Sequence, residues 1–212
     1  MSQETWGFPS TVESVVKVRE NGPLIATAAV LHIFDGAAVV DMTYGRGLFW
    51  TKYRPENLIA HDLYRGDGVD FRDLPEGDSS VDVAVFDPPY LPNESADKTT
   101  VPDFRDRYGI DLTEEQRGPR TVQDVFDLYT AGIAEAHRIL KPRGKLLVKT
   151  MDFVHGGKYH AMRQHVVMSA TELGMSQVDE FVHHSGLGVS NLAGTTQRTS
   201  RRAHSLLCVF KK

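Results

Sequence analysis

The segment Val81–Phe86 and the two prolines that follow it constrain the fold more than any other part of the sequence. Valines alternate along this apolar segment, and Asp87, Pro88, Pro89 and Tyr90 come directly after it. Such a pattern is typical of a strand that is covered on both faces of a sheet. Because proline cannot donate a ladder hydrogen bond and has a fixed φ, the strand must end there. We therefore predict a buried strand that presents Asp87 and Tyr90 on a stiff turn at its carboxyl end.

A second segment, further upstream, repeats this arrangement. The apolar residues 37–40 lead into Asp41-Met-Thr-Tyr-Gly-Arg-Gly47, in which glycine lets the backbone turn sharply and approach a ligand closely. In open α/β sheets, ligands bind at the carboxyl edge, where both segments end. Asp-Pro-Pro-Tyr alone is also an ordinary turn sequence. It is the pair of segments, in this order, that indicates a binding site.

Together, the two segments resemble the S-adenosylmethionine-dependent methyltransferases of the Rossmann-like class. More narrowly, they resemble the enzymes that methylate exocyclic amino groups of nucleic acid bases, such as the DNA N6-adenine and N4-cytosine methylases with an Asp-Pro-Pro-Tyr motif. The resemblance covers roughly residues 37–212, and the two motifs carry most of it. It implies S-adenosylmethionine as the cofactor and nucleic acid as the partner.

The resemblance gives the Asp-Pro-Pro-Tyr motif its role. An exocyclic amine is a poor nucleophile because its lone pair is delocalised into the ring, so acceptors must hold its N–H groups in line for transfer. The resemblance implies that the Asp87 carboxylate and the Pro88 carbonyl are these acceptors, and that Tyr90 stacks on a base flipped out of the duplex. The predicted catalytic residues are Asp87, Pro88, Pro89 and Tyr90.

The predicted cofactor site surrounds the glycine-rich loop. The resemblance places Asp41, Gly45 and Gly47 beneath the methionine part, and Thr43 stands where DNA methyltransferases commonly carry phenylalanine. Asp62 ends a predicted strand, where a carboxylate can accept both ribose hydroxyls of a nucleoside. In the family, an acidic or polar residue further on contacts the adenine amino group. The residues predicted to bind the cofactor are Asp41, Thr43, Gly45, Gly47, Asp62 and Asp73, with Asp70 as the alternative to Asp73.

The sequence argues against two other nucleotide sites. A dinucleotide fingerprint needs a third glycine for packing of the helix on the strand, and Trp50 stands at that position. A phosphate-binding loop would continue with Gly-Lys-Ser or Gly-Lys-Thr, and neither follows Gly47.

Predicted helices and strands alternate along the chain, which indicates an α/β fold. We predict a single domain, residues 1–212, with a Rossmann-like, doubly wound, seven-stranded methyltransferase sheet, helices on both faces and a reversed last strand. Residues 1–36 are expected to be a helical segment. The predicted strands are 37–41, 58–63, 81–86, 145–150, 178–183 and 205–210, with a short strand or turn at 69–73. The predicted helices are 24–34, 48–53, 121–140 and 156–173, with a turn at 141–144.

Two segments are candidates for contacts with nucleic acid. Residues 91–120 form a long polar loop, in which Phe104 and Tyr108 can stack on bases. We interpret it as a target-recognition loop, with a plain surface insertion as the alternative. Residues 185–212 contain no acidic residue, which fits a face that contacts phosphate and fits a solvated tail equally well. The residues predicted to bind the substrate are Tyr90, Arg198, Arg201 and Arg202.

Other reactive side chains have simpler interpretations. Lys149 ends a predicted strand at the cofactor edge, where it either contacts substrate phosphate or is solvated, as strand-end lysines usually are. His183 and His184 are neighbours on a strand and should point to opposite faces. The histidines lack the spacing of a zinc site, so we expect no metal. Cys208, the only cysteine, lies in an apolar run and is interpreted as a buried small hydrophobe.

The composition limits the location of the protein but not its substrate. The net charge of −4 does not by itself indicate a nucleic-acid binder. The apolar runs are too short to span a bilayer, and the N-terminus lacks the basic start and apolar core of a signal peptide. We therefore expect a cytoplasmic protein that makes no contact with a membrane.

The leading hypothesis is an S-adenosylmethionine-dependent N-methyltransferase acting on adenine N6 or cytosine N4 of DNA. Recognition would come from residues 91–120 and the basic tail, or from a homodimer or a separate recognition subunit. The alternative is an RNA methyltransferase acting on adenine N6 or guanine N2 of rRNA or tRNA, which the compact size and Thr43 favour. Enzymes that methylate a protein amide usually begin this motif with asparagine, so Asp87 argues against that activity. The intact motifs also disfavour a binding module on an inactive methyltransferase fold.

Overall fold

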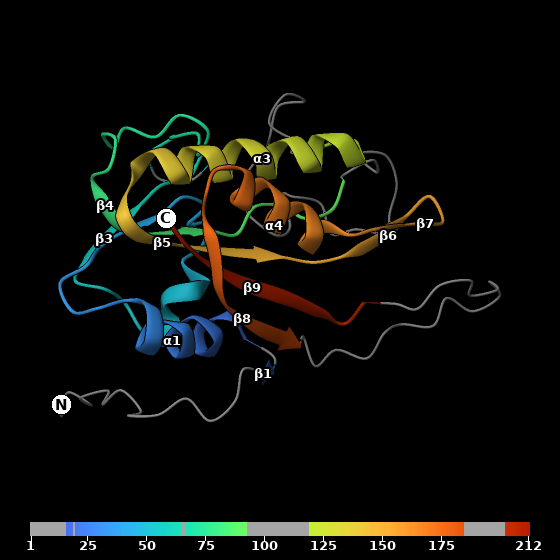
Figure 1. Cartoon of the computed structure of the whole chain (residues 1–212). Coiled ribbons are helices and arrows are strands. Elements are labelled where there is room, and N and C mark those ends of the chain that lie inside the picture. The colour runs from blue at the N-terminus through green and yellow to red at the C-terminus, as the bar shows by residue number, and fades with distance from the viewer. Residues whose placement is uncertain (1–15, 19, 65–66, 93–118, 185–201) are drawn as a thin grey trace.

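The computed structural model describes residues 16–18, 20–64, 67–92, 119–184 and 202–212 (Figure 1). The strands are β1 (Val16–Val18), β2 (Ala38–Asp41), β3 (Asn57–Ala60), β4 (Val81–Phe86), β5 (Leu140–Thr150), β6 (Phe153–His155), β7 (Lys158–His160), β8 (Ser176–His184) and β9 (His204–Lys211). The helices are α1 (Asn21–His32), the short 3₁₀ helix η1 (Leu48–Thr51), α3 (Val122–Ile139) and α4 (Met162–Glu172).

The main sheet has the strand order β1-β8-β9-β5-β4-β2-β3. Strand β9 is antiparallel to both of its neighbours, whereas the other pairs in this sheet are parallel. The reversed last strand is therefore as predicted. Six strands form the body of the sheet, and the three-residue β1 adds to its edge beside β8.

The α/β class is confirmed, and the strands predicted at 37–41, 58–63, 81–86, 145–150, 178–183 and 205–210 correspond to β2, β3, β4, β5, β8 and β9. Of the two structures predicted for residues 69–73, a short strand or a turn, the structure has the turn, in which the Asp73 N–H donates to the Asp70 carbonyl at 3.0 Å. The additional strand of the sheet is β1, which lies within residues 1–36, so that segment is not only helical as predicted. Within it, α1 begins at Asn21, earlier than expected, because proline at position 23 is well tolerated in a first helical turn.

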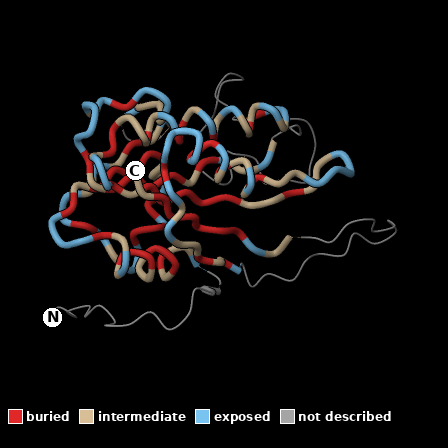
Figure 2. Tube along the Cα trace, in the orientation of Figure 1, coloured by how far each residue is buried: buried red, intermediate tan, exposed pale blue. Residues whose placement is uncertain are grey.

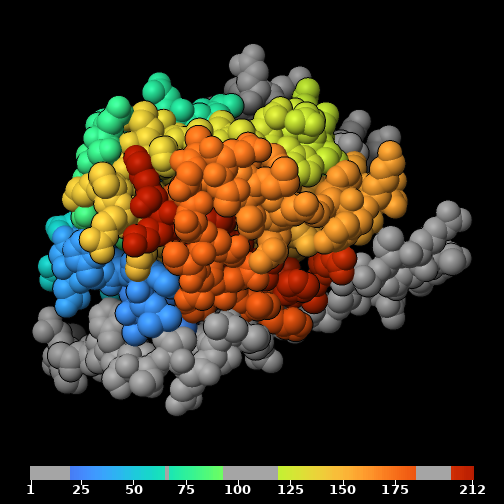
Figure 3. All heavy atoms as spheres, viewed as in Figure 1, coloured from blue at the N-terminus to red at the C-terminus, as the bar shows by residue number. Residues whose placement is uncertain are grey.

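Helices cover both faces of the main sheet (Figure 1). Helices α3 and α4 lie on one face over a core that includes Ala84 and Phe86, and α1 and η1 lie on the other over a core that includes Val83 and Val85. Strand β4 is thus buried on both sides, as its sequence predicts, and the buried residues concentrate along the central strands (Figure 2). In the view of Figure 3, α4 and β8 cover most of β9.

Helix α3 begins where the sequence predicts. Thr121 accepts a hydrogen bond from the Asp124 N–H at 3.1 Å, and the Asp124 carboxylate accepts one from the Thr121 N–H at 2.8 Å. This reciprocal capping box satisfies two backbone donors that the first turn cannot satisfy within the helix. The predicted turn at 141–144 is instead an irregular part of β5, because the register with β4 jumps from Leu140 to Lys145.

The predicted helix over residues 156–173 is too long at its start. Gly156 and Gly157, with φ of 56° and 76°, form the two-residue turn of the β6–β7 hairpin. A two-residue hairpin turn with both φ values positive favours glycine, which explains this pair. Helix α4 begins only at Met162 and is followed by Gly174 with φ of 83°, which ends it as predicted.

Candidate active site at the carboxyl edge of the sheet

Four parallel strands bring the two sequence motifs together. Strands β3, β2, β4 and β5 are adjacent and parallel, so their carboxyl ends meet at one edge of the sheet. Asp41 ends β2, Asp62 follows β3, Asp87 follows β4 and Lys149 lies near the end of β5. The predicted meeting of the glycine-rich loop and Asp-Pro-Pro-Tyr is therefore present.

Asp87 lies on a turn that is bonded to the neighbouring loop. Its backbone N–H donates to Thr43 Oγ1 at 2.8 Å, so the threonine hydroxyl fixes the start of the Asp-Pro-Pro-Tyr turn against the loop after β2. Phenylalanine at position 43 would have no acceptor to offer. Of the two motif prolines, Pro88 is buried and Pro89 is exposed.

The Asp87 carboxylate is only partly satisfied. Oδ2 lies 3.7 Å from Lys149 Nζ, whereas Oδ1 is buried and has no hydrogen-bond partner among the residues that the structure describes. Burial raises the pKa of this carboxyl group, and the positive charge of Lys149 opposes that shift. A buried oxygen without a donor is costly in a folded protein, which makes Oδ1 a candidate acceptor for a further N–H or O–H group.

The glycine-rich loop needs glycine at both predicted positions. Gly45 and Gly47 have φ of 56° and 68°, in the left-handed region that other residues avoid. A Cβ atom on Gly47 would also lie 2.6 Å from the Tyr44 hydroxyl oxygen. At Gly45, in contrast, a Cβ atom would meet nothing nearer than 3.9 Å, so this part of the loop is open to a ligand.

Asp41 holds the glycine-rich loop in place through hydrogen bonds to its carboxylate. It is buried, and its carboxylate accepts hydrogen bonds from the Thr43 N–H at 3.0 Å and from Trp50 Nε1 at 2.6 Å. Burial raises the pKa of Asp41 to about 7, although both hydrogen bonds oppose the shift. Both oxygens are used within the chain, so Asp41 is better described as holding the loop than as a ligand-contacting residue. In the sequence, Trp50 was noted only because it stands where a dinucleotide fingerprint has its third glycine. Nothing there indicated the hydrogen bond from its indole N–H to Asp41.

Asp62 is half-buried beside the loop. One oxygen accepts the Gly45 N–H at 2.8 Å and the other accepts the Tyr64 N–H at 2.9 Å. A carboxylate offers about four lone-pair sites in all, so it can accept several hydrogen bonds at once. Asp73, in contrast, is exposed on the turn at 69–73, where the alternative candidate Asp70 forms an ion pair with Arg72.

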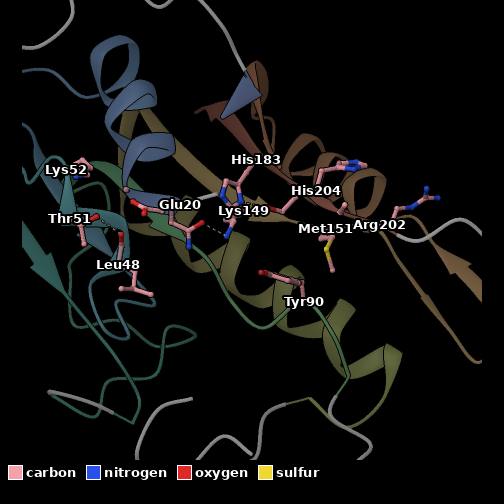
Figure 4. Close-up of a pocket in the computed structure, with 14 residues that line it drawn as sticks. Glu20, Leu48, Thr51, Lys52, Tyr90, Lys149, Met151, His183, Arg202 and His204 are labelled. Atoms are coloured by element: carbon pink, nitrogen blue, oxygen red, sulfur yellow. Dashed lines mark hydrogen bonds between the residues drawn. The ribbon is translucent and has the colours of Figure 1, made fainter. Parts of the chain in front are cut away.

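A cavity of about 520 Å³ opens beside Tyr90 and Lys149, with Thr51 and Lys52 on one side and His204 and Arg202 on the other (Figure 4). Arg202 is the one predicted substrate-binding arginine within the described ranges, since Arg198 and Arg201 lie outside them, as does most of the predicted loop at 91–120. The residues that line the cavity are Glu20, Asn21, Gly22, Leu48, Thr51, Lys52, Tyr90, Lys149, Met151, His183, Arg202, Ala203, His204 and Ser205.

Lys149 is not solvated, contrary to the common behaviour of strand-end lysines. Its side chain is only 3 % exposed, and its ammonium group donates to Asn21 Oδ1 at 2.8 Å. His183 and His184 behave as predicted, with His183 buried and His184 exposed. Cys208 is also buried as predicted, and burial raises the pKa of its thiol to about 12.

His61, which follows β3 next to Asp62, makes a pH-dependent contribution to the stability of the fold. Its Nδ1 is paired with Asp67, and its Nε2 lies 2.8 Å from Glu76 Oε1. Burial alone would lower the pKa of His61, but the hydrogen bonds to Glu76 and Asp67 outweigh it and raise the pKa. A histidine whose folded pKa is raised stabilises the fold fully below its unfolded pKa and loses that contribution as the pH rises through the folded pKa.

We expect the difference in unfolding free energy between wild type and His61→Gln to shrink as the pH rises from 6 to 9. Chemical denaturation at each pH measures this difference, with His184→Gln as the control at an exposed histidine. A change that is seen in His61→Gln but not in His184→Gln reports His61. A difference that is constant with pH would show that the pKa of His61 is the same in the folded and the unfolded protein.

The described ranges contain no group of three or more His, Cys, Asp or Glu side chains suited to hold a metal ion. None of the helices in the same ranges is both long and apolar enough to cross a membrane.

No protein family and no curated protein matches the sequence. Among solved structures, TrmN from Thermus thermophilus aligns with a TM-score of 0.51 at 16 % identity, over 89 % of this chain and 48 % of that one. The 1,6-didemethyltoxoflavin-N1-methyltransferase of Burkholderia thailandensis, with 1,6-didemethyltoxoflavin and S-adenosylhomocysteine bound, aligns with a TM-score of 0.50 at 15 % identity, over 91 % and 77 %.

TTHA0409, a putative DNA modification methylase from Thermus thermophilus crystallised with S-adenosylmethionine, aligns with a TM-score of only 0.39 at 14 % identity, over 65 % of this chain. The chain spans about half the length of TrmN and of TTHA0409. The first two likenesses establish that the chain has a fold found in methyltransferases.

Proposed function

We propose that this protein is an S-adenosylmethionine-dependent methyltransferase that methylates an exocyclic amino group of a base in DNA, adenine N6 or cytosine N4. The observation that carries the proposal is the buried Oδ1 of Asp87, which accepts no hydrogen bond among the described residues and follows the strand next to the glycine-rich loop. An amine that is to be methylated needs an acceptor of this kind beside the methyl donor.

The residues of the loop fit the proposed cofactor. Gly45 leaves open space above the loop, and the Asp62 carboxylate, which accepts the Gly45 N–H, is the proposed acceptor of the ribose hydroxyls. Asp41 and Trp50 would keep the loop in shape beneath the methionine part. When bound, S-adenosylmethionine supplies a methyl group on a sulfonium centre, which is an excellent leaving group. Asp73 stays a proposed contact of the adenine amino group.

The chain's own groups would activate the amine. Asp87 Oδ1 and the Pro88 carbonyl accept its two N–H groups, which turns the nitrogen lone pair toward the methyl group. Because burial raises the pKa of Asp87, this carboxylate is also suited to take the proton that the nitrogen releases. Stacking on Tyr90 would offset part of the cost of flipping the base by roughly 1–3 kcal/mol.

The cavity beside Tyr90 is the proposed place for the target nucleotide. It is lined by the Tyr90 ring and by the basic side chains of Lys52, Lys149 and Arg202, which suit a base attached to phosphates. The other contacts proposed for the nucleic acid are Arg198, Arg201 and residues 91–120. A homodimer or a separate recognition subunit stays a prediction.

An RNA substrate, with adenine N6 or guanine N2 as target, is the second candidate. Thr43 favours it, since the sequence departs here from the common DNA-methylase pattern and the hydroxyl is used to bind the Asp87 N–H.

Methyl transfer from labelled S-adenosylmethionine to duplex DNA and, separately, to total RNA tests the proposal. Nucleoside analysis then identifies the product. Label in N6-methyladenine or N4-methylcytosine of DNA is the expected result and names the base. Label only in RNA would replace DNA by the second candidate. Label in neither, with no binding of S-adenosylmethionine in calorimetry, would overturn the proposed function.

A further inference from the structure

The ammonium group of Lys149 has an unusual set of neighbours for a strand-end lysine. It donates to Asn21 Oδ1 at 2.8 Å, lies 3.7 Å from Asp87 Oδ2, and lies 5.8 Å from the centroid of the Tyr90 ring. The ring of Phe49 lies on it as well, at 5.5 Å. Burying an ammonium group is costly unless charged and polar partners compensate it. These partners come from α1, η1 and the turn after β4, so Lys149 joins three separate parts of the site.

We propose that Lys149 is the positioning residue of this site: its ammonium group keeps Asp87 ionised and turns Asp87 Oδ2 inward, so that Oδ1 is left to receive the N–H of the target amine. The inference rests on the proposed function and adds to it a residue that the sequence motifs do not contain. Asn21, the first residue of α1, would hold the ammonium group at the correct place.

The protonation state of Asp87 matters because the target amine is a hydrogen-bond donor. An ionised carboxylate only accepts hydrogen bonds, whereas a protonated one presents a hydroxyl group that also donates. A protonated Asp87 would therefore lose part of its capacity to hold the amine. Burial favours the protonated form, and the charge of Lys149 is the influence that opposes it.

The other groups around Asp87 do not supply a competing positive charge. Asp41 on β2 is acidic, and Tyr129 on α3 is neutral at pH 7, because burial raises its pKa well above the ordinary value. His183 on β8 lies near Lys149, and burial, followed by the charge of Lys149, lowers its pKa to about 4, so it is also neutral. Among these described groups, Lys149 is the cation.

The same ammonium group also contacts the aromatic residue proposed to stack on the base. A cation within about 6 Å of a ring centroid is attracted to the ring face. Lys149 thereby restrains Tyr90 together with Asp87, so the acceptor and the stacking surface keep a fixed relation. A neutral side chain of similar size would fill the space but lose both restraints.

The test compares the pH dependence of kcat in wild type, Lys149→Met and Lys149→Arg. Methionine keeps most of the volume without the charge, so kcat should fall about 10- to 100-fold at pH 7, and the acid limb should move to higher pH by about one unit or more. Arginine keeps the charge and should leave the acid limb near its wild-type position. Lys145→Met is the control, since Lys145 lies in the middle of the same strand, away from Asp87, and donates to the Leu31 carbonyl.

A second measurement keeps the inference independent of activity. The pH titration of the Asp87 carboxyl carbon, observed by NMR of the folded protein labelled at the aspartate carboxyl group and assigned with Asp87→Asn, should move to higher pH in Lys149→Met. If wild type titrates as Lys149→Met does, or if Lys149→Met lowers kcat equally at every pH, Lys149 does not act through the charge of Asp87 and the inference is wrong. If the titration moves but wild type transfers no methyl group, the proposed function fails while the coupling of Lys149 to Asp87 stands.

Discussion

Asp87→Ala is expected to lower the rate of methyl transfer by on the order of 10³-fold while S-adenosylmethionine still binds. Removing one precisely placed group that stabilises the reacting atoms typically has an effect of this size, and Asp87 Oδ1 is the buried acceptor at the proposed position of the amine. The loop should survive, because Asp87 is bonded to Thr43 through its backbone N–H and not through its side chain. Single-turnover assays measure the transfer step, and calorimetry measures cofactor binding.

The matched control is Asp82→Asn on the same strand. Asp82 lies at the opposite end of β4, where its carboxylate accepts the Lys141 ammonium at 2.8 Å and the Ala38 N–H at 2.9 Å. This variant should lose stability but keep the wild-type rate per folded molecule. If Asp87→Ala retained more than about a tenth of the activity, the assignment of Asp87 as the amine acceptor would be untenable.

The parts of the site that lie next to each other in the sheet were predictable from the sequence. Two apolar strands that each end in a motif must bring those motifs to one edge if the strands are parallel, and β2 and β4 are parallel neighbours. Gly45 and Gly47 were predictable for a second reason, which is that few other residues adopt a positive φ.

The groups that support the site were not predictable, because their partners are distant in the sequence. Lys149 is bonded to Asn21, 128 residues away, and only the packing of α1 on the sheet brings them together. From the sequence alone, the end of a strand indicates an exposed lysine. Trp50 is nearer to Asp41, but nothing in the motif shows that the indole N–H would reach its carboxylate.

The wrong element predictions come from local signals that fit two structures. Gly156-Gly157 can precede a helix or turn a hairpin, and the pairing of Phe153 with His160 decides for the hairpin. Residues 69–73 likewise fitted a short strand or a turn, and the prediction left both open. There, Asp70 accepts the backbone N–H of Arg72 and pairs with its guanidinium group, which favours a turn.

Gly132→Ala is expected to destabilise the protein by about 2 kcal/mol, although alanine is the better helix former by about 1 kcal/mol. A Cβ atom at this position of α3 would lie 2.2 Å from Cζ of Phe86, so the ring would have to move. Phe86 is buried between Tyr129 and Phe71, with ring centroids at 5.8 and 5.0 Å, and has little space to move into. Denaturant unfolding measures the loss.

The clash also links the core to the site, because Phe86 immediately precedes Asp87. A ring pushed away from α3 shifts the end of β4, so Gly132→Ala should lower the rate of methyl transfer even in the folded fraction. The double variant Gly132→Ala/Phe86→Leu should cost less than the sum of the single variants, since a smaller side chain leaves room for the methyl group. Gly77→Ala is the control, as nothing lies within 4 Å of its added Cβ. Additive costs would mean that α3 adjusts without moving Phe86, and the turn after β4 would then be independent of this contact.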